Sequence, residues 1–409
     1  MVSDAPVPNA KQKTTVEVEK LVYGGDALAR LSGHVVLMPF ALPGEQVQIE
    51  PRRAKGDLLR ARSVEVLQPS LRRVQPKCEY FGRCGGCQYQ HAEYAYQLEQ
   101  KSCILRETLL RIGGISFEPD IRTISGEPWQ YRNRIQLHFE SGRMGFRYPD
   151  SHQICGITHC PISSPKLNEV IGILAKAVTR PEWPAFLRSL EIFTDEKAVQ
   201  LHVVETNRPV ASRFFEWMTE LIPGCVPGAL DYDTGKRAYR VSRGSFFQVN
   251  RFLIEPLVEE GLTDVSGQTA LDLYAGVGLF TIPMADRFQH VEGVERGGAA
   301  CRDLEWNIAG LGERVSIAKA DASEYLKRTT VAPDFIVADP PRAGIGREVA
   351  GELLRIGSPR VTLVSCDPAT LSRDLKLLQE RYVIERMTVV DLFPQTFHFE
   401  TVAHLGLKR

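Results

Sequence analysis

Residues 271–280 read LDLYAGVGLF, and this stretch decides the fold. An apolar run leads directly into two glycines, Gly276 and Gly278, as happens where a buried strand turns into a helix and the backbone passes close to a ligand. Further apolar runs follow it at intervals: HVEGVE (290–295), VSIAKA (315–320), DFIVADPP (334–341) and RVTLVSC (360–366). Short apolar strands that alternate with helical stretches predict a doubly wound parallel α/β sheet.

A carboxylate at the end of the second of these strands indicates an adenosine site. Glu295 ends the strand that follows Asp272, and an acid at this position can hold both hydroxyls of a ribose. A nicotinamide site would carry a third glycine for the pyrophosphate near Phe280 and Thr281, so a ligand without phosphates fits better. A nicotinamide-dependent oxidoreductase stays an alternative, which a cofactor-binding titration separates from the first.

Two further acids follow later strands of the sheet. Asp321, in AKADASEY (318–325), is placed to reach an adenine edge, although an aspartate there can instead cap the next helix. Asp339 precedes Pro340, Pro341 and Arg342 at the carboxyl edge, where ligands of open α/β sheets bind. An isolated Asp-Pro-Pro could also be only a stiff turn.

A cysteine follows the last apolar strand. Cys366, in SCDP (365–368), stands at a strand-to-helix junction, where the amides of a helix N-terminus can depress the pKa of a thiol. A lone cysteine there is more often a small buried hydrophobe. A distant carboxylate, Glu400 in FPQTFHFET (393–401), can serve as a base, unless it forms an ion pair with a nearby arginine. We predict Cys366 as a nucleophile and Glu400 as its partner.

Three cysteines lie close together before the predicted sheet. Cys78, Cys84 and Cys87 follow the spacing Cys-x5-Cys-x2-Cys in a loop rich in glycine and aromatics. Thiols so close together in a reducing compartment indicate a metal, and the spacing suits zinc and an iron–sulfur cluster equally well. For the fourth ligand we favour Cys160, in HCP (159–161), over Cys155 and Cys103.

The rest of the chain divides by its pattern. Residues 13–69 form short alternating strands broken by glycine turns, which predicts a small β-barrel. Residues 70–92 and 120–239 mix helical and strand-like runs around the cysteine loop and predict an α+β middle domain. Residues 93–119 and 240–409 are assigned to the parallel-sheet domain, with a helix over 93–112 that we expect to pack on it.

With these motifs in place, the chain resembles the bacterial iron–sulfur-type RNA 5-methyluridine methyltransferases, the family of the 23S ribosomal RNA uracil-C5 methyltransferases. The likeness covers nearly the whole chain and includes CEYFGRCGGCQYQ (78–90), SFFQVN (245–250), DLYAGVGLF (272–280), DPPRAG (339–344), SCDPATLSRDL (365–375) and HFET (398–401). It implies a Rossmann-like class I methyltransferase domain, preceded by a TRAM/OB-like β-barrel and a middle domain with a metal-cluster loop.

The resemblance also implies the cofactors and their residues. S-adenosylmethionine would contact Gln248, Tyr274, Gly276, Glu295, Asp321 and Asp339, and a 4Fe-4S cluster would sit on Cys78, Cys84, Cys87 and Cys160. Cys366 would add to carbon 6 of a uridine so that carbon 5 can accept a methyl group, and Glu400 would then remove the hydrogen from carbon 5. Phe397 and Phe399 are bulkier than the usual neighbours of this base, which affects packing around Glu400 and leaves its carboxylate in place.

The expected enzyme is an RNA (uracil-5-)-methyltransferase that acts as a cytoplasmic monomer and binds RNA but no membrane. The N-terminal stretch MVSDAPVPNAKQK lacks the apolar core of a signal peptide, and no apolar run reaches the roughly 20 residues of a membrane span. The formal net charge is zero, so RNA contacts must come from a local patch. Residues 51–77 supply eight basic against two acidic residues, although such a run can also be a solvated face.

The target of the expected reaction stays open. Ribosomal RNA is favoured over transfer RNA by analogy alone. We expect a target uridine to be swung out of its stack, with flanking nucleotides held by aromatics such as Tyr80, Phe81 and Tyr89. A non-catalytic RNA-binding protein with a structural metal is the remaining alternative, and transfer of a tritiated methyl group would exclude it.

Overall fold

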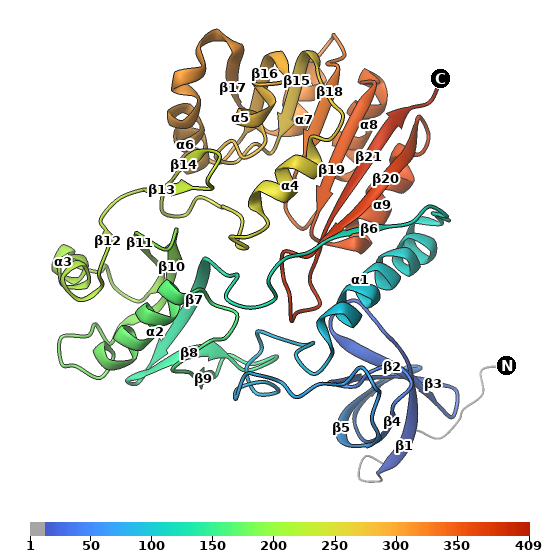
Figure 1. Ribbon diagram of the computed structural model, residues 1–409, viewed down its shortest axis with the longest axis vertical. Coiled ribbons are helices and arrows are strands. Elements are labelled where there is room, and N and C mark those ends of the chain that lie inside the picture. The colour runs from blue at the N-terminus through green and yellow to red at the C-terminus, as the bar shows by residue number, and fades with distance from the viewer. Residues whose placement is uncertain (1–12) are drawn as a thin grey trace. The chain divides into compact units, whose positions relative to one another are not determined.

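The computed structural model describes residues 13–409. The N-terminal stretch 1–13, for which no signal peptide is expected, lies outside the described residues except for its last residue. The chain divides into two compact units (Figure 1). The first contains the described part of residues 1–104 together with 147–155 and 393–398, and the second contains 105–146, 156–392 and 399–409. No helix within residues 13–409 is long and apolar enough to cross a membrane.

The predicted N-terminal barrel is confirmed. Its five strands close in the order β1-β2-β3-β5-β4. They are β1 (Thr14–Leu21), β2 (Asp26–Leu31), β3 (His34–Pro39), β4 (Gln46–Lys55) and β5 (Leu58–Gln68). Alternate residues point inward, so Val36, Met38, Val47 and Ile49 are fully buried while their neighbours stay polar, as the period of a strand requires. Closure also leaves this small sheet without a free edge along its paired length.

A mixed sheet follows the cysteine loop and lies mainly in the second unit. Its six strands run in the order β12-β11-β10-β7-β8-β9. The elements of this region are β7 (Arg134–Glu140), β8 (Arg143–Arg147), β9 (Ile154–Gly156), α2 (Pro165–Ala177), β10 (Leu187–Thr194), β11 (Val199–Thr206), α3 (Ser212–Leu221) and β12 (Cys225–Val226). Helix α2 begins where Ser164 caps the amide of Leu167, and it buries Val170, Ile171 and Leu174.

The predicted parallel sheet lies in the second unit and is its largest sheet. Eight strands run in the order β17-β16-β15-β18-β19-β21-β20-β6. They are β6 (Arg122–Ile124), β15 (Gly267–Leu273), β16 (Phe288–Glu295), β17 (Val315–Lys319), β18 (Phe335–Ala338), β19 (Arg360–Ser365), β20 (Tyr382–Val390) and β21 (Glu400–Leu407). Strands β15 to β19 are parallel, whereas β21 is inserted antiparallel between β19 and β20. The order reverses between β15 and β18, which is where open α/β sheets bind ligands.

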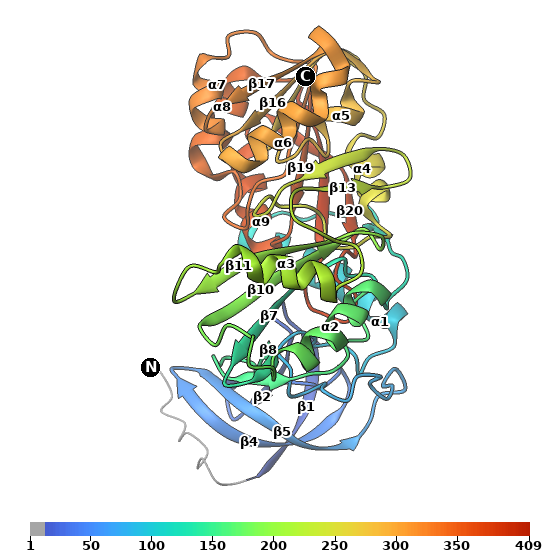
Figure 2. The ribbon, with the colours of Figure 1, turned by 90° about the vertical axis from the view of Figure 1, so that its left-hand side faces the viewer.

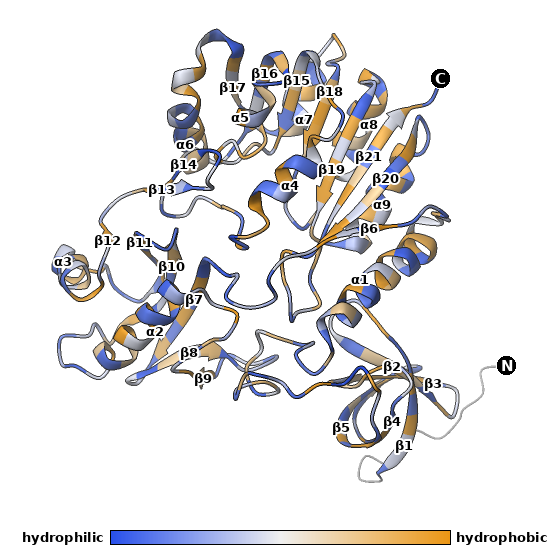
Figure 3. Cartoon of the chain, in the orientation of Figure 1, coloured by the Kyte–Doolittle hydropathy of each residue, from blue (hydrophilic) through white to orange (hydrophobic). Residues whose placement is uncertain are grey.

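Helices cover both faces of this sheet. Figure 2 shows α7 and α8 on one side of it and α5 on the other. The helices are α4 (Ile254–Gly261), α5 (Thr281–Met284), α6 (Gly298–Ile308), α7 (Ala322–Arg328), α8 (Gly346–Ile356) and α9 (Pro368–Leu378), and a short hairpin of β13 (Leu230–Asp233) and β14 (Ala238–Val241) precedes them. Cover on both faces explains why the central strands are almost continuously apolar, as Figure 3 shows for β18 and β19.

The segment before the mixed sheet also contributes to the parallel sheet. Helix α1 (Tyr94–Thr108) continues into the wide turn η1 (Leu109–Gly113), which packs against α9. A β-carbon at Gly113 would lie 3.0 Å from the Ser372 carbonyl oxygen, so the glycine permits a tight approach of η1 to α9. Strand β6 then pairs with β20. The end of the predicted helix therefore packs against α9, whereas residues 93–104 belong to the first unit.

Candidate active site

Strand register brings the two predicted catalytic residues together. Strands β19 and β21 are antiparallel neighbours, and Ser365 pairs with Thr401. The next positions outward are therefore Cys366 and Glu400, which face each other at the carboxyl end of β19. Directly opposed residues of such a pair have β-carbons about 5 Å apart, within reach of a shared substrate ring.

Glu400 lies in a desolvated position. Glu400 is 6% exposed, and its Oε2 has no hydrogen-bond partner within the described residues. Burial, reinforced by the nearby Asp339 carboxylate, raises the pKa of Glu400 well above its usual value, while Arg342 opposes the shift. A carboxylate with a raised pKa is a stronger base, which suits it to remove a proton from carbon.

The thiol of Cys366 does not match its expected state. Burial raises its pKa to about 11, the Glu400 carboxylate adds to this effect, and Arg342 acts against it. The expectation that helix amides depress this pKa is wrong, because the effect of burial dominates. Asp367 also caps α9, where its Oδ1 accepts the Thr370 N–H at 2.8 Å. The helix end is thus already occupied by a carboxylate.

Arg342 is a third charged residue that acts on this pair. Its positive charge lowers the pKa of both Cys366 and Glu400, so it lies near both. The signal was available in the sequence, since Arg342 directly follows Asp339-Pro340-Pro341 at the end of β18. Its cation favours the thiolate that a cysteine nucleophile needs.

Two aspartates of neighbouring strands also have raised pKa values: the buried Asp272 at the end of β15 and the half-buried Asp339 after β18. Burial raises the pKa of Asp272 and that of Asp339 to about 7 each. Thr281 Oγ1 donates to Asp272 Oδ2 at 2.5 Å, but Asp272 Oδ1 has no partner within the described residues. The Asp339 carboxylate adds to the raised pKa of both Asp272 and Glu400, because each negative charge makes ionisation of its neighbours more costly.

The glycine turn after β15 has the backbone shape that a ligand site requires. Tyr274 has a φ of 64°, which is strained for a residue with a side chain, and Gly276 has a φ of 57°. A β-carbon at Gly276 would meet nothing within 4 Å, whereas one at Gly278 would lie 2.7 Å from Leu304. Gly278 is therefore needed for packing, and Gly276 leaves open space beside the turn.

Glu295 is held in place by backbone amides. The Gly276 N–H donates to Oε2 at 2.9 Å, and the Gly297 N–H donates to Oε1. Each carboxylate oxygen can accept a further hydrogen bond, so the pair stays available to ribose hydroxyls. The turn and the acid thus form one hydrogen-bonded unit.

Asp321 takes the alternative role that its sequence position allowed. It caps α7, where Oδ1 accepts the Ser323 N–H at 3.0 Å and the Ser323 hydroxyl at 2.9 Å. Both bonds lower its pKa, and Arg296 Nη1 lies 3.3 Å from Oδ2. A capping role does not prevent a ligand contact, because Oδ2 is partly exposed with the side chain.

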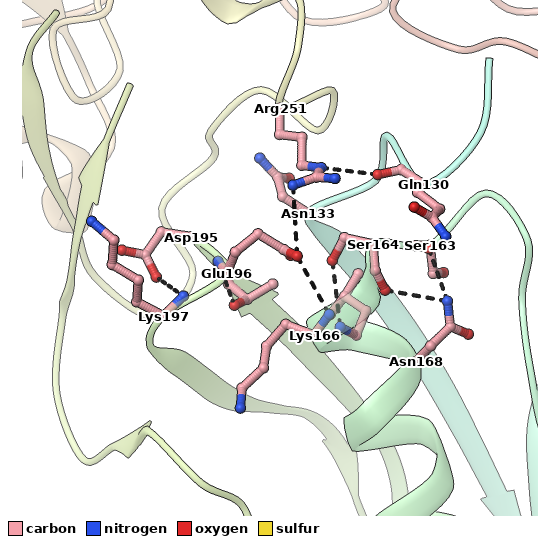
Figure 4. A network of polar contacts seen from close by, with 12 residues as sticks. Gln130, Asn133, Ser163, Ser164, Lys166, Asn168, Asp195, Glu196, Lys197 and Arg251 are labelled. Carbon is pink, nitrogen blue, oxygen red and sulfur yellow. Dashed lines mark hydrogen bonds and ion pairs between the residues drawn. The ribbon is translucent and has the colours of Figure 1, made fainter. Parts of the chain in front are cut away.

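Gln248 lies in a segment fixed from the mixed sheet. Residue 248 is 3% exposed, and Asn133 Nδ2 donates to its carbonyl oxygen at 3.0 Å and to the Tyr232 hydroxyl at 3.0 Å. Figure 4 shows Asn133 beside the polar network around Arg251, whose Nε donates to the Gln130 carbonyl oxygen at 2.9 Å. Residues 248–251 are therefore held at Gln248 by Asn133 and at Arg251 by Gln130.

The predicted metal ligands are distributed over both units of the chain. Among residues 13–409, no group of three or more His, Cys, Asp or Glu side chains is arranged to hold a metal ion. Cys78, Cys84 and Cys87 belong to the first unit and Cys160 to the second. Cys160 is held by Asn168, whose Oδ1 accepts its N–H at 2.8 Å, and Figure 4 shows the same Asn168 bonded to Ser163.

Several known proteins are similar to this chain in sequence. The family model described as tRNA (Uracil-5-)-methyltransferase matches residues 218–408. An uncharacterized RNA methyltransferase of Aquifex aeolicus is 34% identical and covers 96% of this chain and 98% of its own length. The 23S rRNA (uracil(1939)-C(5))-methyltransferase RlmD of Vibrio parahaemolyticus is 32% identical, over 95% of this chain and 94% of that protein.

A solved structure matches over nearly the whole chain. The crystal structure of Pyrococcus abyssi tRNA (uracil-54, C5)-methyltransferase in complex with S-adenosyl-L-homocysteine is 26% identical. It aligns with a TM-score of 0.75 and covers 96% of this chain and 100% of that one. Fold and relatives together define an RNA methyltransferase that uses S-adenosylmethionine. Within that class, the chain belongs to the RNA uracil-5-methyltransferase family.

Proposed function

We propose that the chain methylates carbon 5 of a uridine in 23S ribosomal RNA, with Cys366 as nucleophile and Glu400 as base. The observation that carries this proposal is the register of β19 and β21, which opposes the thiol and the carboxyl group. S-adenosylmethionine, when bound, supplies the methyl group. The relatives named for 23S rRNA favour this substrate.

The two side chains would act in sequence. The Cys366 thiolate adds to carbon 6 of the ring, which makes carbon 5 nucleophilic enough to take a methyl group. Glu400 then removes the hydrogen from carbon 5, and the thiolate leaves as the double bond re-forms. The raised pKa of Glu400 supports this order, because a strong base is needed only after methyl transfer.

The residues around the glycine turn would hold the methyl donor. Glu295 would accept the ribose hydroxyls, Gly276 would leave room for the backbone approach, and Asp321 would reach the adenine edge. Tyr274, Gln248 and Asp339 complete the proposed set by resemblance. The donor chemistry fits, since a sulfonium ligand without phosphates needs no cationic cradle.

RNA would bind through the barrel's basic ribbon, defined as Arg52, Arg53 and Lys55 at the end of β4. All three are exposed, and none forms an ion pair with a carboxylate within the described part of the chain. Two of the aromatics expected to hold nucleotides are less suited to that role, because Tyr89 is fully buried and Phe81 packs against Phe40 and His91.

A 4Fe-4S cluster on Cys78, Cys84, Cys87 and Cys160 stays a prediction from spacing and resemblance. Zinc remains its alternative. Iron, acid-labile sulfide and zinc should be measured in protein purified without oxygen. Four iron and four sulfide per chain would support the cluster, and one zinc without sulfide would support the alternative.

The remaining expectations also stay proposals. We infer a three-part organisation of barrel, middle domain and methyltransferase domain with the boundaries given above, in a cytoplasmic monomer. Transfer RNA is the second candidate substrate, favoured by the Pyrococcus abyssi structure.

The decisive experiment uses a tritiated methyl donor with the whole chain. Transcripts of 23S rRNA and of transfer RNA would be offered separately, each beside a copy in which the labelled site carries cytidine in place of uridine. Label only in uridine-containing 23S transcripts is expected. Label only in transfer RNA would move the proposal to the second substrate, and no label in either would contradict it. Mapping 5-methyluridine in RNA from a deletion strain identifies the position.

A further inference from the structure

One buried carboxylate outside the predicted site holds the segment 242–250. Asp303, in α6, is 1% exposed. Its Oδ2 accepts the Ser242 N–H at 2.8 Å and the Ser245 hydroxyl at 2.6 Å, and its Oδ1 accepts the Ser242 hydroxyl at 2.6 Å. Hydrogen bonds to a carboxylate are among the stronger ones, so three of them at one buried group fix the start of the segment firmly.

The same segment is held from the opposite side. Arg134 of β7 donates from Nη1 to the Ser245 carbonyl oxygen at 2.9 Å, and its guanidinium carbon lies 4.1 Å from the centre of the Phe193 ring. Ser245 is therefore bonded through its hydroxyl to α6 and through its carbonyl to the mixed sheet. Gln248 follows three residues later, with its own carbonyl held by Asn133.

Burial along the segment agrees with this clamp. Ser245 and Phe247 are each 2% exposed, whereas Phe246 between them is 64% exposed. Phe247 packs on Tyr232 and Tyr239, with ring centres 4.9 Å and 5.5 Å apart. The rings of Phe247, Tyr232 and Tyr239 therefore add apolar packing to the hydrogen bonds that hold the segment.

Helix α6 joins this clamp to the donor site. The helix begins at Gly298, just after Gly297, whose N–H bonds the Glu295 carboxylate. The Cys301 N–H donates to the Gly297 carbonyl oxygen at 2.8 Å, and Asp303 lies two residues further along. One short helix therefore positions Glu295 at its start and the 242–250 segment at its second turn.

We propose that Asp303 is a positioning residue for the methyl donor, which keeps Gln248 in place relative to Glu295 through Ser242 and Ser245. This inference rests on the proposed function, in which Gln248 and Glu295 both contact S-adenosylmethionine. Without the carboxylate the segment samples other positions, and the donor binds only to the fraction of molecules in which the segment is in place.

The test compares matched substitutions on one helix in the full chain. Asp303→Ala removes all three bonds. Asp303→Asn keeps them, because its amide oxygen can accept from the Ser242 N–H and Ser245 hydroxyl while its amide nitrogen donates to the Ser242 hydroxyl. Glu305→Gln is the control, since Glu305 is on the same helix but pairs with Lys319 at the surface. Ser245→Ala removes one bond and serves if Asp303→Ala does not fold.

Two measurements are made on each variant. Calorimetry gives the Kd of S-adenosyl-L-homocysteine, and hydrogen exchange gives the protection of amides 242–250. For Asp303→Ala we expect the Kd to rise about tenfold, as it would if the clamped state fell to about a tenth of the population, with faster exchange in 242–250. Asp303→Asn should stay within about threefold, Ser245→Ala should fall between the two, and Glu305→Gln should match the unmodified chain.

The outcomes separate this inference from the proposed function. Unchanged Kd and unchanged exchange in Asp303→Ala and Ser245→Ala would overturn it. Equal weakening by Asp303→Asn and Asp303→Ala with the segment still protected would also overturn it, because the effect would then come from charge alone. If the unmodified chain bound no S-adenosyl-L-homocysteine, the proposed function would fail and this inference with it, whereas binding with unaffected variants would remove only this inference.

Discussion

Burial and the surrounding charged side chains together set the protonation state of the reactive thiol. The Glu400 and Asp339 carboxylates disfavour the thiolate of Cys366, and Arg342 favours it. Removing water from the thiol contributes most to its raised pKa. The free site therefore holds Cys366 as a neutral thiol at neutral pH, and ionisation becomes part of the work of catalysis.

The pH dependence of methylation follows from these pKa values. The thiol must lose a proton and its pKa is raised to about 11, so the thiolate fraction grows about tenfold for each pH unit below that value. Glu400 must also be ionised, and its raised pKa gives the same sign. We expect single-turnover methylation to accelerate as pH rises from 7 to 9. A rate that falls over this range would contradict the assignment of Cys366 as the attacking group.

Substitution of the two catalytic side chains should separate their steps. Cys366→Ala should abolish methyl transfer while S-adenosyl-L-homocysteine still binds, because the nucleophile contacts the RNA base. Glu400→Gln should form the carbon–sulfur bond and then stall, which leaves a protein–RNA adduct stable in denaturing gels. Full product release from Glu400→Gln would show that another group takes the proton.

Loss of the nearby cation should shift the pH profile. Arg342→Ala removes a charge that favours the thiolate, so methylation at pH 7.5 should fall roughly tenfold and recover in part near pH 9. Arg342→Lys should retain most of the rate. Arg347→Ala, an exposed arginine on α8, is the control and should change neither value. A loss that is independent of pH would mean that Arg342 acts on something other than ionisation.

At the scale of elements, Glu260 joins α4 to the strands that carry the site. Its Oε1 accepts the Thr388 hydroxyl of β20 at 2.7 Å, and its Oε2 accepts from Arg122 of β6 at 3.0 Å. His404 of β21 lies 3.4 Å away. Burial opposes ionisation of Glu260, but the bonds from His404 and Thr388 and the charge of Arg386 outweigh it and lower the pKa to about 2.

Glu260→Gln should therefore destabilise the chain. Breaking a buried ion network costs about 3 kcal/mol of unfolding free energy, measured by urea denaturation at pH 7. Since the folded pKa is depressed from 4.5 to about 2, this stabilisation is complete above about 4.5 and is lost as pH falls towards 2. The difference between the two proteins should narrow over that window. Glu259→Gln, which breaks an exposed pair with Lys236, should leave the urea midpoint unchanged.

The same elements show what the sequence could predict. Alternation in residues 13–69 and the apolar runs after 271 predict the barrel and the parallel sheet, because burial on one or both faces leaves a pattern in the sequence. Strand β6 has only three residues and no pattern, so its place at the far edge of the sheet could not be predicted. Cys366 and Glu400 could be chosen by residue type, but their opposition depends on a register that no local signal specifies.

The electrostatic effects in the site could not be predicted either, because they depend on residues that are far apart in the sequence. The raised pKa of Cys366 depends on Glu400 and Asp339, which reach it only through the fold. Asp303 escaped notice because an aspartate inside a helix usually faces solvent, and only its three bonds reveal a role. Family membership itself was predictable, since the motifs are distributed over most of the chain.

At the scale of the whole molecule, equal numbers of acidic and basic residues mean that RNA affinity must come from local charge. Replacing Arg52, Arg53 and Lys55 of the basic ribbon by alanine should weaken RNA binding. The affinity is measured by fluorescence anisotropy. The slope of log affinity against log salt should fall by about two if three phosphate contacts are lost, since each contributes roughly 0.7 on a single strand. Donor binding should not change.

A matched control keeps the total charge change equal. Arg328, Arg347 and Lys376 are exposed basic residues on helices α7, α8 and α9. Alanine at these three positions should leave both affinity and salt slope as they are. An equal loss in the control would assign the effect to overall charge and remove the ribbon from the RNA interface.

The opposition of Cys366 and Glu400 across β19 and β21 also limits how this protein can diversify. A residue gained or lost inside either strand turns every following side chain to the other face of the sheet, so the carboxyl group would swing away from the thiol. Exchange of one apolar residue for another along these strands is cheap by comparison. Over evolutionary time, changes of length should accumulate in the connecting loops, while 360–366 and 400–407 keep their spacing.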